Sequence, residues 1–195
     1  MVSKEIFYQS VRAEKLITKL SNAQVQSIDS VLNWWDVLGH TDLRWLAYMF
    51  ATILHETAGT MLPINEYGKG KGRPYGRKLK RNGVSYTIPN KIYYGRGYVQ
   101  LTWYENYELM GRLLNVDLLN NPELALEQDV AVRILFEGML KGSSSFGDFT
   151  GRCLEQYFNT TTDDPKNARR IINGLDKAAL IKGYHDKFLR CLQVV

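Results

Sequence analysis

The stretch Trp45-Leu46-Ala47-Tyr48-Met49-Phe50-Ala51-Thr52-Ile53-Leu54 is an almost unbroken apolar run of helical length, and it leads directly into His55-Glu56-Thr57-Ala58-Gly59. A run of this kind predicts a helix that is largely buried. Glu56 then lies where the buried helix ends and a polar, glycine-rich segment begins. A carboxylic acid at such a boundary can give its proton to a departing sugar oxygen. The competing interpretation is structural: Glu56 is the last polar residue of a core helix that Gly59 terminates.

A second carboxylate follows ten residues after Glu56, in the segment Ile64-Asn65-Glu66-Tyr67-Gly68. Glu66 lies in a loop rich in glycine and lysine and is the candidate to activate a water molecule. Glycoside hydrolysis with inversion needs two carboxyl groups about 6.5–9.5 Å apart, so that one water fits beside the sugar. A ten-residue interval that contains a turn can span that distance.

A third motif runs from Tyr93 to Tyr107 and reads YYGRGYVQLTWYENY. Thr102 in this motif offers a hydroxyl that both donates and accepts hydrogen bonds, which suits the orientation of a water molecule. Thr102 and Glu105 also match the S/T-x-x-E pattern of a capping box, which predicts a helix beginning at Trp103.

Together with His55-Glu56-Thr57 and the later Arg170-Ile171-Ile172-Asn173-Gly174, this motif resembles the family 19 glycoside hydrolases, the chitinase-like branch of the lysozyme superfamily. The resemblance covers roughly Ile28 to Leu192, with the motifs in the family's order. It implies an inverting hydrolase in which Glu56 is the general acid, Glu66 the general base, and Thr102 the residue that holds the water. The predicted substrate-binding residues are His55, Tyr94, Gln100, Asn106, Tyr107 and Asn173; three of them (Gln100, Asn106, Asn173) match cleft residues of the family, and the tyrosines are possible sugar platforms.

The short interval between the glutamates is similar to that of phage-type members that cut bacterial cell wall, so we expect an endolysin that hydrolyses the β-1,4 bonds of peptidoglycan for host cell lysis. Three alternatives stay open. The first is a chitinase acting on β-1,4 N-acetylglucosamine polymers. The second is a catalytically silent glycan-binding module, favoured if the two glutamates lie far apart or are paired in salt bridges. The third is a structural lysozyme-like part of a phage particle.

Length and composition predict one lysozyme-like catalytic domain over residues 1–195, mainly α (α+β), with two lobes around a cleft and a small β-hairpin beside it. The chain has 195 residues, of which 45% are hydrophobic, enough for one packed core. Cys153 and Cys191 fall on helical patterns and are expected to be buried thiols, which fits a reducing cytosol. We expect a monomer.

No basic region followed by an apolar run opens the chain at 1–6, and no apolar stretch reaches about 18 residues. We therefore expect no signal peptide and no membrane span. The expected location is the host bacterial cytoplasm, before release to the periplasm and cell wall. The resemblance to endolysins implies that a separate membrane-permeabilising protein provides this release.

Helical signals dominate the rest of the sequence. Ser21 and Gln24 predict a capped helix through Trp35. Further helices are predicted from Asn121 to near Gly142, from Asp164 to Gly174, and from a cap at Asp176 through Leu192, and a hairpin from strands at 85–88 and 92–94.

The window from Lys69 to Arg81 carries seven positive charges and no acid, whereas the remainder of the chain has 18 basic and 20 acidic residues. It is either a solvated loop or a surface that steers the protein onto an anionic cell envelope. Nucleic acid is rejected as a partner because it leaves the HET and QLT motifs without a role. The histidines at 40, 55 and 185 lack the spacing of a metal site, and we expect neither a metal nor a cofactor.

Overall fold

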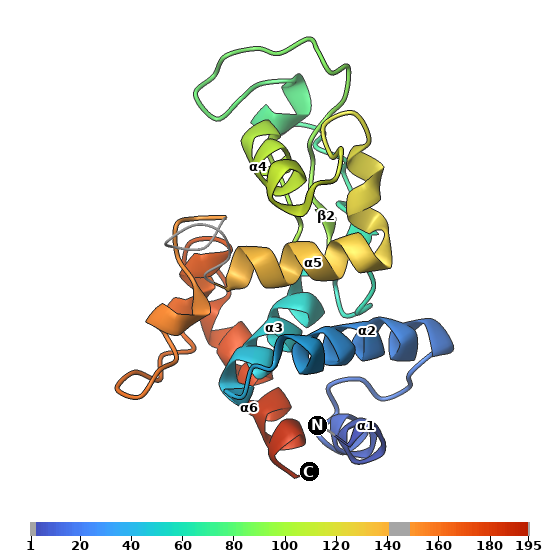
Figure 1. The fold of residues 1–195 in the computed structure, drawn as a ribbon, viewed down its shortest axis with the longest axis vertical. Helices are drawn as coiled ribbons and strands as arrows, with labels where there is room; N and C mark the ends of the chain where they lie inside the picture. Colours follow the sequence, from blue (N-terminus) through green and yellow to red (C-terminus); the bar gives the residue numbers. More distant parts are fainter. Residues whose placement is uncertain (1–2, 141–148, 195) are drawn as a thin grey trace.

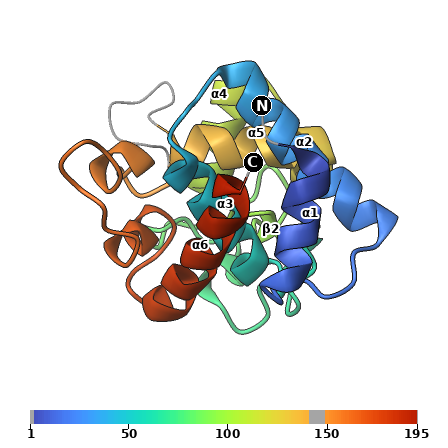
Figure 2. The same ribbon diagram turned by 90° about the horizontal axis from the view of Figure 1, so that it is seen from below.

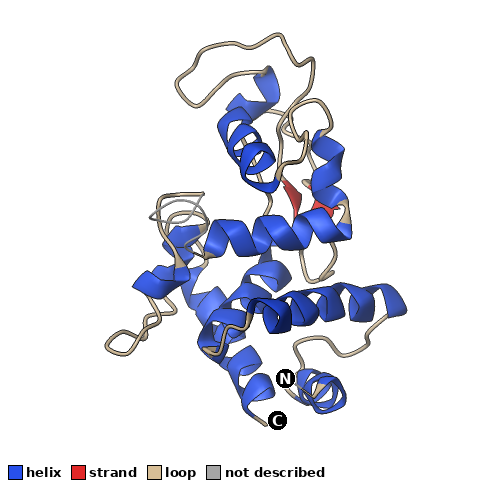
Figure 3. Cartoon of the chain, viewed as in Figure 1, coloured by secondary structure: helices blue, strands red, loops and turns tan. Residues whose placement is uncertain are grey.

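The computed structural model describes residues 3–140 and 149–194. The fold is mainly helical, with one small two-stranded sheet (Figures 1 and 3). The α-helices are α1 (Lys4–Ala13), α2 (Asn22–Leu38), α3 (Leu43–Glu56), α4 (Tyr104–Leu114), α5 (Gln128–Met139) and α6 (Ala178–Gln193). The short elements are the strands β1 (Ile64–Asn65) and β2 (Arg96–Gly97) and the 3-10 helices η1 (Pro74–Arg77), η2 (Pro122–Leu126), η3 (Leu154–Gln156) and η4 (Asn167–Ile171).

Helix α3 forms the centre of the core, as its apolar sequence predicts. Every residue from Leu46 to Leu54 is buried. Asp42 begins the helix by accepting a hydrogen bond from the Arg44 amide at 3.0 Å, the usual role of an N-cap. Helix α6 packs along α3, with the rings of Phe50 and Phe188 stacked at 5.4 Å, and Figure 2 shows α6 lying across α3 next to α1. The buried α3 therefore delivers Glu56, its last residue, to the edge of the core.

The chain forms two lobes. In Figure 1, α1, α2, α3 and α6 gather in the lower lobe, α4 and the sheet lie in the upper lobe, and α5 runs between them. Strands β1 and β2 pair antiparallel, with Ile64 opposite Gly97 and Asn65 opposite Arg96. The predicted fold class, mainly α with a small sheet, is confirmed.

The predicted strands at 85–88 and 92–94 are wrong, since the sheet is formed by residues on either side of them. Tyr86 and Tyr93 pack instead into an aromatic cluster with Tyr104 and Tyr107, at ring distances from 5.0 to 5.4 Å. Aromatic residues favour strands largely because they pack well on a half-buried surface. Here the same packing is achieved against α4.

Helix boundaries differ from the prediction in the second half of the chain. The helix expected from Asn121 is divided into η2 and α5, because Glu127 is extended with φ −65° and ψ 131°. Helix α5 ends at Met139, and the expected stop at Gly142 lies outside the described residues. The segment from Asp164 contains only the 3-10 helix η4, and α6 begins at Ala178 without a side-chain cap from Asp176. The predicted capping box of Ser21 and Gln24 is confirmed.

Both cysteines are buried free thiols, as predicted. Within the described residues, every helix is too short or too polar to cross a bilayer.

Candidate active site

A cavity of about 590 Å³ is lined by residues of both lobes. Glu56 at the end of α3, Arg170 of η4, and Ile172, Asn173 and Gly174 after η4 form one side. The third sequence motif, from Val99 to Asn106, forms the other. Further lining residues are Tyr75, Arg81, Phe149, Thr150 and Arg152.

Glu56 is held by a buried arginine. Its Oε1 accepts a hydrogen bond from Arg169 Nη1 at 2.5 Å, and the two side chains are 15% and 4% exposed. Arg169 is fixed in turn because its Nε donates to the carbonyl of Asp176 at 3.1 Å. The ion pair meets one condition that would favour a silent module. However, the carboxyl of Glu56 still lines the cavity, and a guanidinium beside it stabilises the negative charge that remains once a proton has been given away.

Glu66 lies directly after β1 and is oriented by two hydrogen bonds. Its Oε1 accepts from the Tyr75 hydroxyl at 2.9 Å, and its Oε2 accepts from the Gly95 amide at 3.2 Å. Burial, followed by the hydrogen bond to Glu66, raises the pKa of Tyr75 to about 12, so the hydroxyl keeps its proton across the physiological range. Tyr75 lines the cavity, and Glu66 is half-buried beside it and joined to it by the hydrogen bond.

The backbone of the third motif is strained where it meets the cavity. Gln100 and Trp103 have φ values of 53° and 80°, a region that residues with side chains rarely adopt. Gln100 Nε2 donates to the carbonyls of Ile64 and Gly97 at 3.1 and 3.2 Å, which ties the motif to the sheet. A Cβ at Gly95 would lie 2.7 Å from Gln100 Oε1, so a larger residue there would force the Gln100 side chain to shift.

The predicted capping box of Thr102 is wrong. Helix α4 begins at Tyr104 after Trp103, and no side chain caps it. Glu105 Oε1 accepts instead from the Arg81 amide at 2.8 Å, because the strained turn at Trp103 takes Thr102 out of the N-cap position. The Thr102 hydroxyl donates to the Gln100 carbonyl at 2.7 Å and lines the cavity, and its oxygen has lone pairs that can accept from a water. Its role in holding the water stays a prediction.

The structure brings some of the predicted substrate-binding residues together and separates others. Gln100, Asn106 and Asn173 line the cavity with Glu56. His55 points elsewhere and lines a separate cavity of about 350 Å³ with Lys15 and Tyr184. Neighbouring residues on a helix face different sides, so His55 cannot share the direction of Glu56.

Neither predicted tyrosine platform is among the lining residues of the cavity, and Tyr94 is half-buried. Tyr107 is fully buried, and its hydroxyl donates to the Tyr94 carbonyl at 2.9 Å. The guanidinium of Arg96, itself buried, lies 3.6 Å from the centre of the Tyr94 ring. The placement of Tyr107 corrects its predicted contact with substrate, since it is a core residue that supports the motif. Trp103 is the aromatic residue of this motif that lines the cavity.

Sequence reasoning missed Tyr75 and Arg152 as residues of the cavity, and it did not predict the pairing of Arg169 with Glu56. Each depends on how distant segments meet, and Arg169 lies 113 positions from Glu56. One signal for the Arg169 pairing was available in the sequence. A glutamate at the end of a buried helix needs either a cationic partner or a proton, so a nearby arginine could be expected.

The family model for chitinase class I matches residues 33–139 of the chain. Among curated proteins, Basic endochitinase B of Arabidopsis thaliana is 40% identical over 101 residues, which cover 46% of this chain and 29% of that protein. Endochitinase EP3 of Arabidopsis thaliana is 38% identical over 104 residues, or 52% of this chain and 36% of that protein. The matches thus span about a third of the length of these relatives.

Solved structures have the same fold at lower identity. The class IV chitinase from Zea mays has a TM-score of 0.63 at 21% identity, and the match covers 98% of this chain and 92% of the other. Chitinase C from Streptomyces griseus HUT6037 has a TM-score of 0.59 at 23% identity, with 99% and 91% covered. Because the family model covers more than half of the sequence, the chain belongs to the chitinase class I family, glycoside hydrolase family 19.

Proposed function

We propose that the chain hydrolyses β-1,4 glycosidic bonds of a glycan built from N-acetylated amino sugars, and that it inverts the anomeric centre. The observation that carries this proposal is Glu56. It ends the buried helix α3, lines the cavity between the lobes and pairs with a buried arginine. The family to which the chain belongs supports the same reaction class.

In the proposed reaction, Glu56 gives a proton to the glycosidic oxygen as the bond from this oxygen to the anomeric carbon breaks. A water molecule attacks the anomeric carbon from the opposite face, and Glu66 takes a proton from that water. Arg169 stabilises the carboxylate that forms on Glu56, because its guanidinium is already in position and needs no reorganisation. Tyr75 holds Glu66 in one orientation.

The first candidate substrate is a chitin-type polymer of N-acetylglucosamine, because the curated relatives are named endochitinases. The second candidate is bacterial peptidoglycan, cut by a phage endolysin during host lysis. The observation that favours it is the positive charge of the cavity, where Arg81, Arg152 and Arg170 are lining residues. The location in the host cytoplasm and release by a membrane-permeabilising protein belong to this second candidate and remain predictions.

The test is hydrolysis of chitohexaose and of purified sacculi, with Glu56→Gln as the control. The variant keeps size and hydrogen bonding but has no proton to donate, so we expect at least ~10²-fold loss of activity, with the fold retained. Proton NMR in the first minutes identifies the anomer, and mass spectrometry of the muropeptides identifies the sugar at the new reducing end. A variant with more than a tenth of the wild-type rate excludes Glu56 as the acid, and an initial β-anomer excludes inversion.

A further inference from the structure

The lining of the cavity that contains Glu56 carries more cations than carboxylates. Arg81, Arg152 and Arg170 line it, and Glu56 is the one carboxylate among the lining residues in the described part of the chain. Glu56 is already paired with Arg169, which lies behind it. Within the described residues, the three lining arginines therefore present positive charge that no carboxylate of the cavity lining other than Glu56 offsets.

Arg81, Arg152 and Arg170 differ from five other arginines of the described residues, each of which pairs with a carboxylate. Five arginines of the described residues contact a carboxylate: Arg44 pairs with Asp42, Arg96 with Glu123, Arg133 with Asp129, Arg169 with Glu56, and Arg190 with Glu14. Arg81, Arg152 and Arg170 are exposed, and within residues 3–140 and 149–194 none lies within ion-pair distance of a carboxylate.

The local contacts of the three arginines hold them at the cavity and leave donors available. Arg152 Nη1 donates to the Tyr157 hydroxyl at 3.3 Å, and Arg170 Nε donates to Asn167 Oδ1 at 3.3 Å. Each guanidinium has five N–H donors, so most of them are not used by these contacts. On the opposite lobe, the Arg81 guanidinium lies 6.0 Å from the ring centre of Trp103.

The segments that carry Arg152 and Arg170 are joined by hydrogen bonds. The Thr150 hydroxyl donates to the carbonyls of Arg170 and Ile171 at 2.8 and 3.0 Å, which joins the segment before Arg152 to η4. Cations thus come from both lobes, with two of them on the η4 side.

We propose that Arg81, Arg152 and Arg170 recognise carboxylates on the glycan, so that the cleft takes an anionic β-1,4 amino-sugar strand in preference to a neutral one. The planar fork of a guanidinium matches a carboxylate, whereas the hydroxyl and acetamido groups of a neutral sugar need no cation. Binding a neutral strand would remove water from three cations without providing a counter-charge, which is unfavourable. The inference rests on the proposed function for the glycan class, and it assigns the substrate preference of that same site.

A cell-wall strand offers carboxylates from two sources: the peptides attached to the muramic sugars, and the lactyl ethers of those muramic sugars that carry no peptide. Strands freed of their peptides keep only the lactyl carboxylates. Coupling these to methylamine gives a neutral strand of the same length. The three strands differ in charge and not in the sugar backbone.

Affinity is measured by calorimetry in a Glu56→Gln background, where the strands are not cut. We expect the protein with all three arginines intact to bind the peptide-free strand more tightly than its methylamide. Arg152→Gln and Arg170→Gln should each reduce this ratio of affinities about fivefold at low salt, the size that exposed charge pairs reach. Arg12→Gln, an exposed arginine of α1 outside the cleft, is the matched control and should leave the ratio unchanged.

Equal affinity for all three strands, or a ratio of affinities that the arginine variants leave unchanged, overturns the inference. A preference found only with the peptides attached assigns recognition to the peptide carboxylates. Failure of the proposed function is a separate outcome. In that case the wild-type protein cuts neither the strands nor chitohexaose, although it still binds the anionic strand more tightly.

Discussion

Arg169 and Glu56 lie 113 positions apart in the chain and meet at 2.5 Å, where the end of α3 faces η4. The C-terminal end of a helix carries partial negative charge, so a glutamate is unfavourable as the last residue of α3. The guanidinium of Arg169 offsets that cost. The same contact places a positive charge beside the carboxyl group from which the proton is proposed to leave.

Replacing Arg169 with methionine tests this relationship. Arg169→Met leaves Glu56 without its buried partner, and we expect a loss of about 3 kcal/mol in the free energy of unfolding. We also expect kcat to fall at least about tenfold, since the carboxylate formed by proton donation is no longer stabilised. Arg169→Lys keeps the charge without the planar fork and should recover part of kcat. Urea unfolding and chitohexaose hydrolysis measure the two effects, and wild-type kcat in Arg169→Met would remove the arginine from the mechanism.

The role of Glu66 is tested by two variants of different severity. Glu66→Gln cannot accept the proton of water, so we expect loss comparable to that of Glu56→Gln, with partial recovery by azide, which needs no deprotonation. Tyr75→Phe keeps Glu66 and removes the hydroxyl that orients it, and we expect a smaller loss, about tenfold, without recovery by azide. If Tyr75→Phe is more damaging than Glu66→Gln, then Tyr75 has a direct role and Glu66 is not the base.

The sequence predicted the features that depend on local patterns. The apolar run before Glu56, the capping box at Ser21 and the mainly α fold class could be inferred because helix periodicity and caps are encoded within a few residues. The sheet could not, because β1 and β2 are two residues each and pair across a long loop. Tyr86 and Tyr93 fit the pattern of a strand, but in the structure they are buried in the core.

The same division applies to the site. Glu56, Gln100 and Asn173 lie on the cavity because their motifs end elements that converge there. His55 was misplaced because adjacency in sequence was taken as adjacency in the site. Arg152 lies outside the three motifs, and only its packing beside η4 identifies it.

The histidine at 185 predicts how stability depends on pH. His185 is buried, stacks on Phe158 at 5.3 Å and lies 5.8 Å from the Tyr48 ring, and burial lowers its pKa below the ordinary 6.5. Below pH 6.5 the unfolded chain therefore binds a proton that the folded chain does not. Stability from this group is complete above pH 6.5 and is lost as the pH falls through that value towards the folded pKa.

His185→Phe removes this titration and keeps an aromatic ring against Phe158. We expect the free energy of unfolding of the wild type to fall more steeply between pH 7 and pH 5 than that of the variant, both measured in urea. Asp186, at 3.3 Å from Nδ1, raises the pKa of His185 and opposes this effect without reversing it. If the free energies of unfolding of the two proteins fall in parallel between pH 7 and pH 5, His185 does not cause the loss of stability at acid pH.

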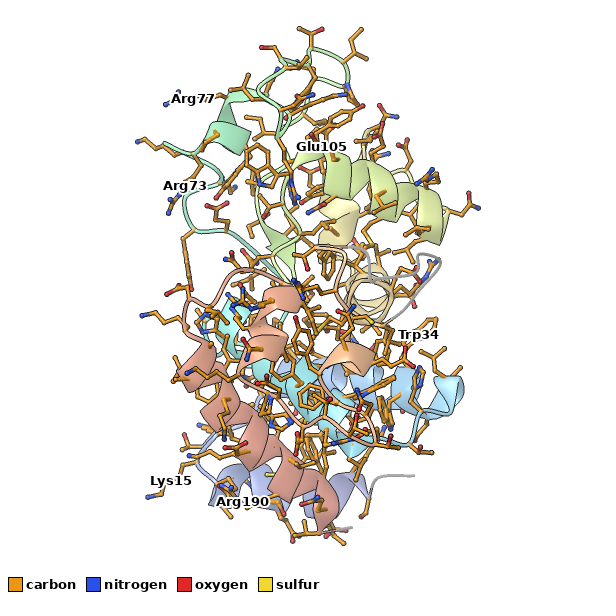
Figure 4. All side chains as sticks on the ribbon, turned by 90° about the vertical axis from the view of Figure 1, so that its left-hand side faces the viewer. Lys15, Trp34, Arg73, Arg77, Glu105 and Arg190 are labelled. Atoms are coloured by element: carbon orange, nitrogen blue, oxygen red, sulfur yellow. The ribbon has the colours of Figure 1, made fainter. Side chains whose placement is uncertain are left out.

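The basic window from Lys69 to Arg81 contains cations that contact other residues or line the cavity, and further exposed cations outside the cavity lining. Lys80 Nζ lies 4.4 Å from the Tyr104 ring centre, Lys78 donates to Asn90, and Arg81 belongs to the cavity. Lys71, Arg73 and Arg77 are exposed, and Figure 4 shows Arg73 and Arg77 pointing away from the body of the upper lobe. A test of steering should therefore reverse these exposed cations and leave intact those that contact other residues or line the cavity.

If the window steers the protein onto an anionic cell envelope, the combined variant Lys71→Glu, Arg73→Glu, Arg77→Glu should bind intact sacculi more weakly at low salt. Its hydrolysis of chitohexaose should stay near that of the wild type, because these side chains lie outside the cavity lining. A control with the same change of charge is Arg12→Glu, Lys15→Glu, Lys19→Glu, three exposed cations at the end of α1 and in the segment after it. Figure 4 shows Lys15 at the opposite end of the molecule from Arg73 and Arg77. Net charge alone would weaken both variants equally, whereas steering by the window weakens only the first.

Salt provides the second criterion for steering. Raising ionic strength from about 0.01 M to about 0.15 M shortens the screening length from ~30 Å to ~8 Å, so the difference between wild type and the window variant should narrow. If the window instead contacts the wall through apolar packing, the difference in binding between wild type and the window variant should persist at high salt. Equal binding of the two proteins to sacculi at about 0.01 M would leave the window as a solvated surface, and the charge preference would then reside in the cleft arginines alone.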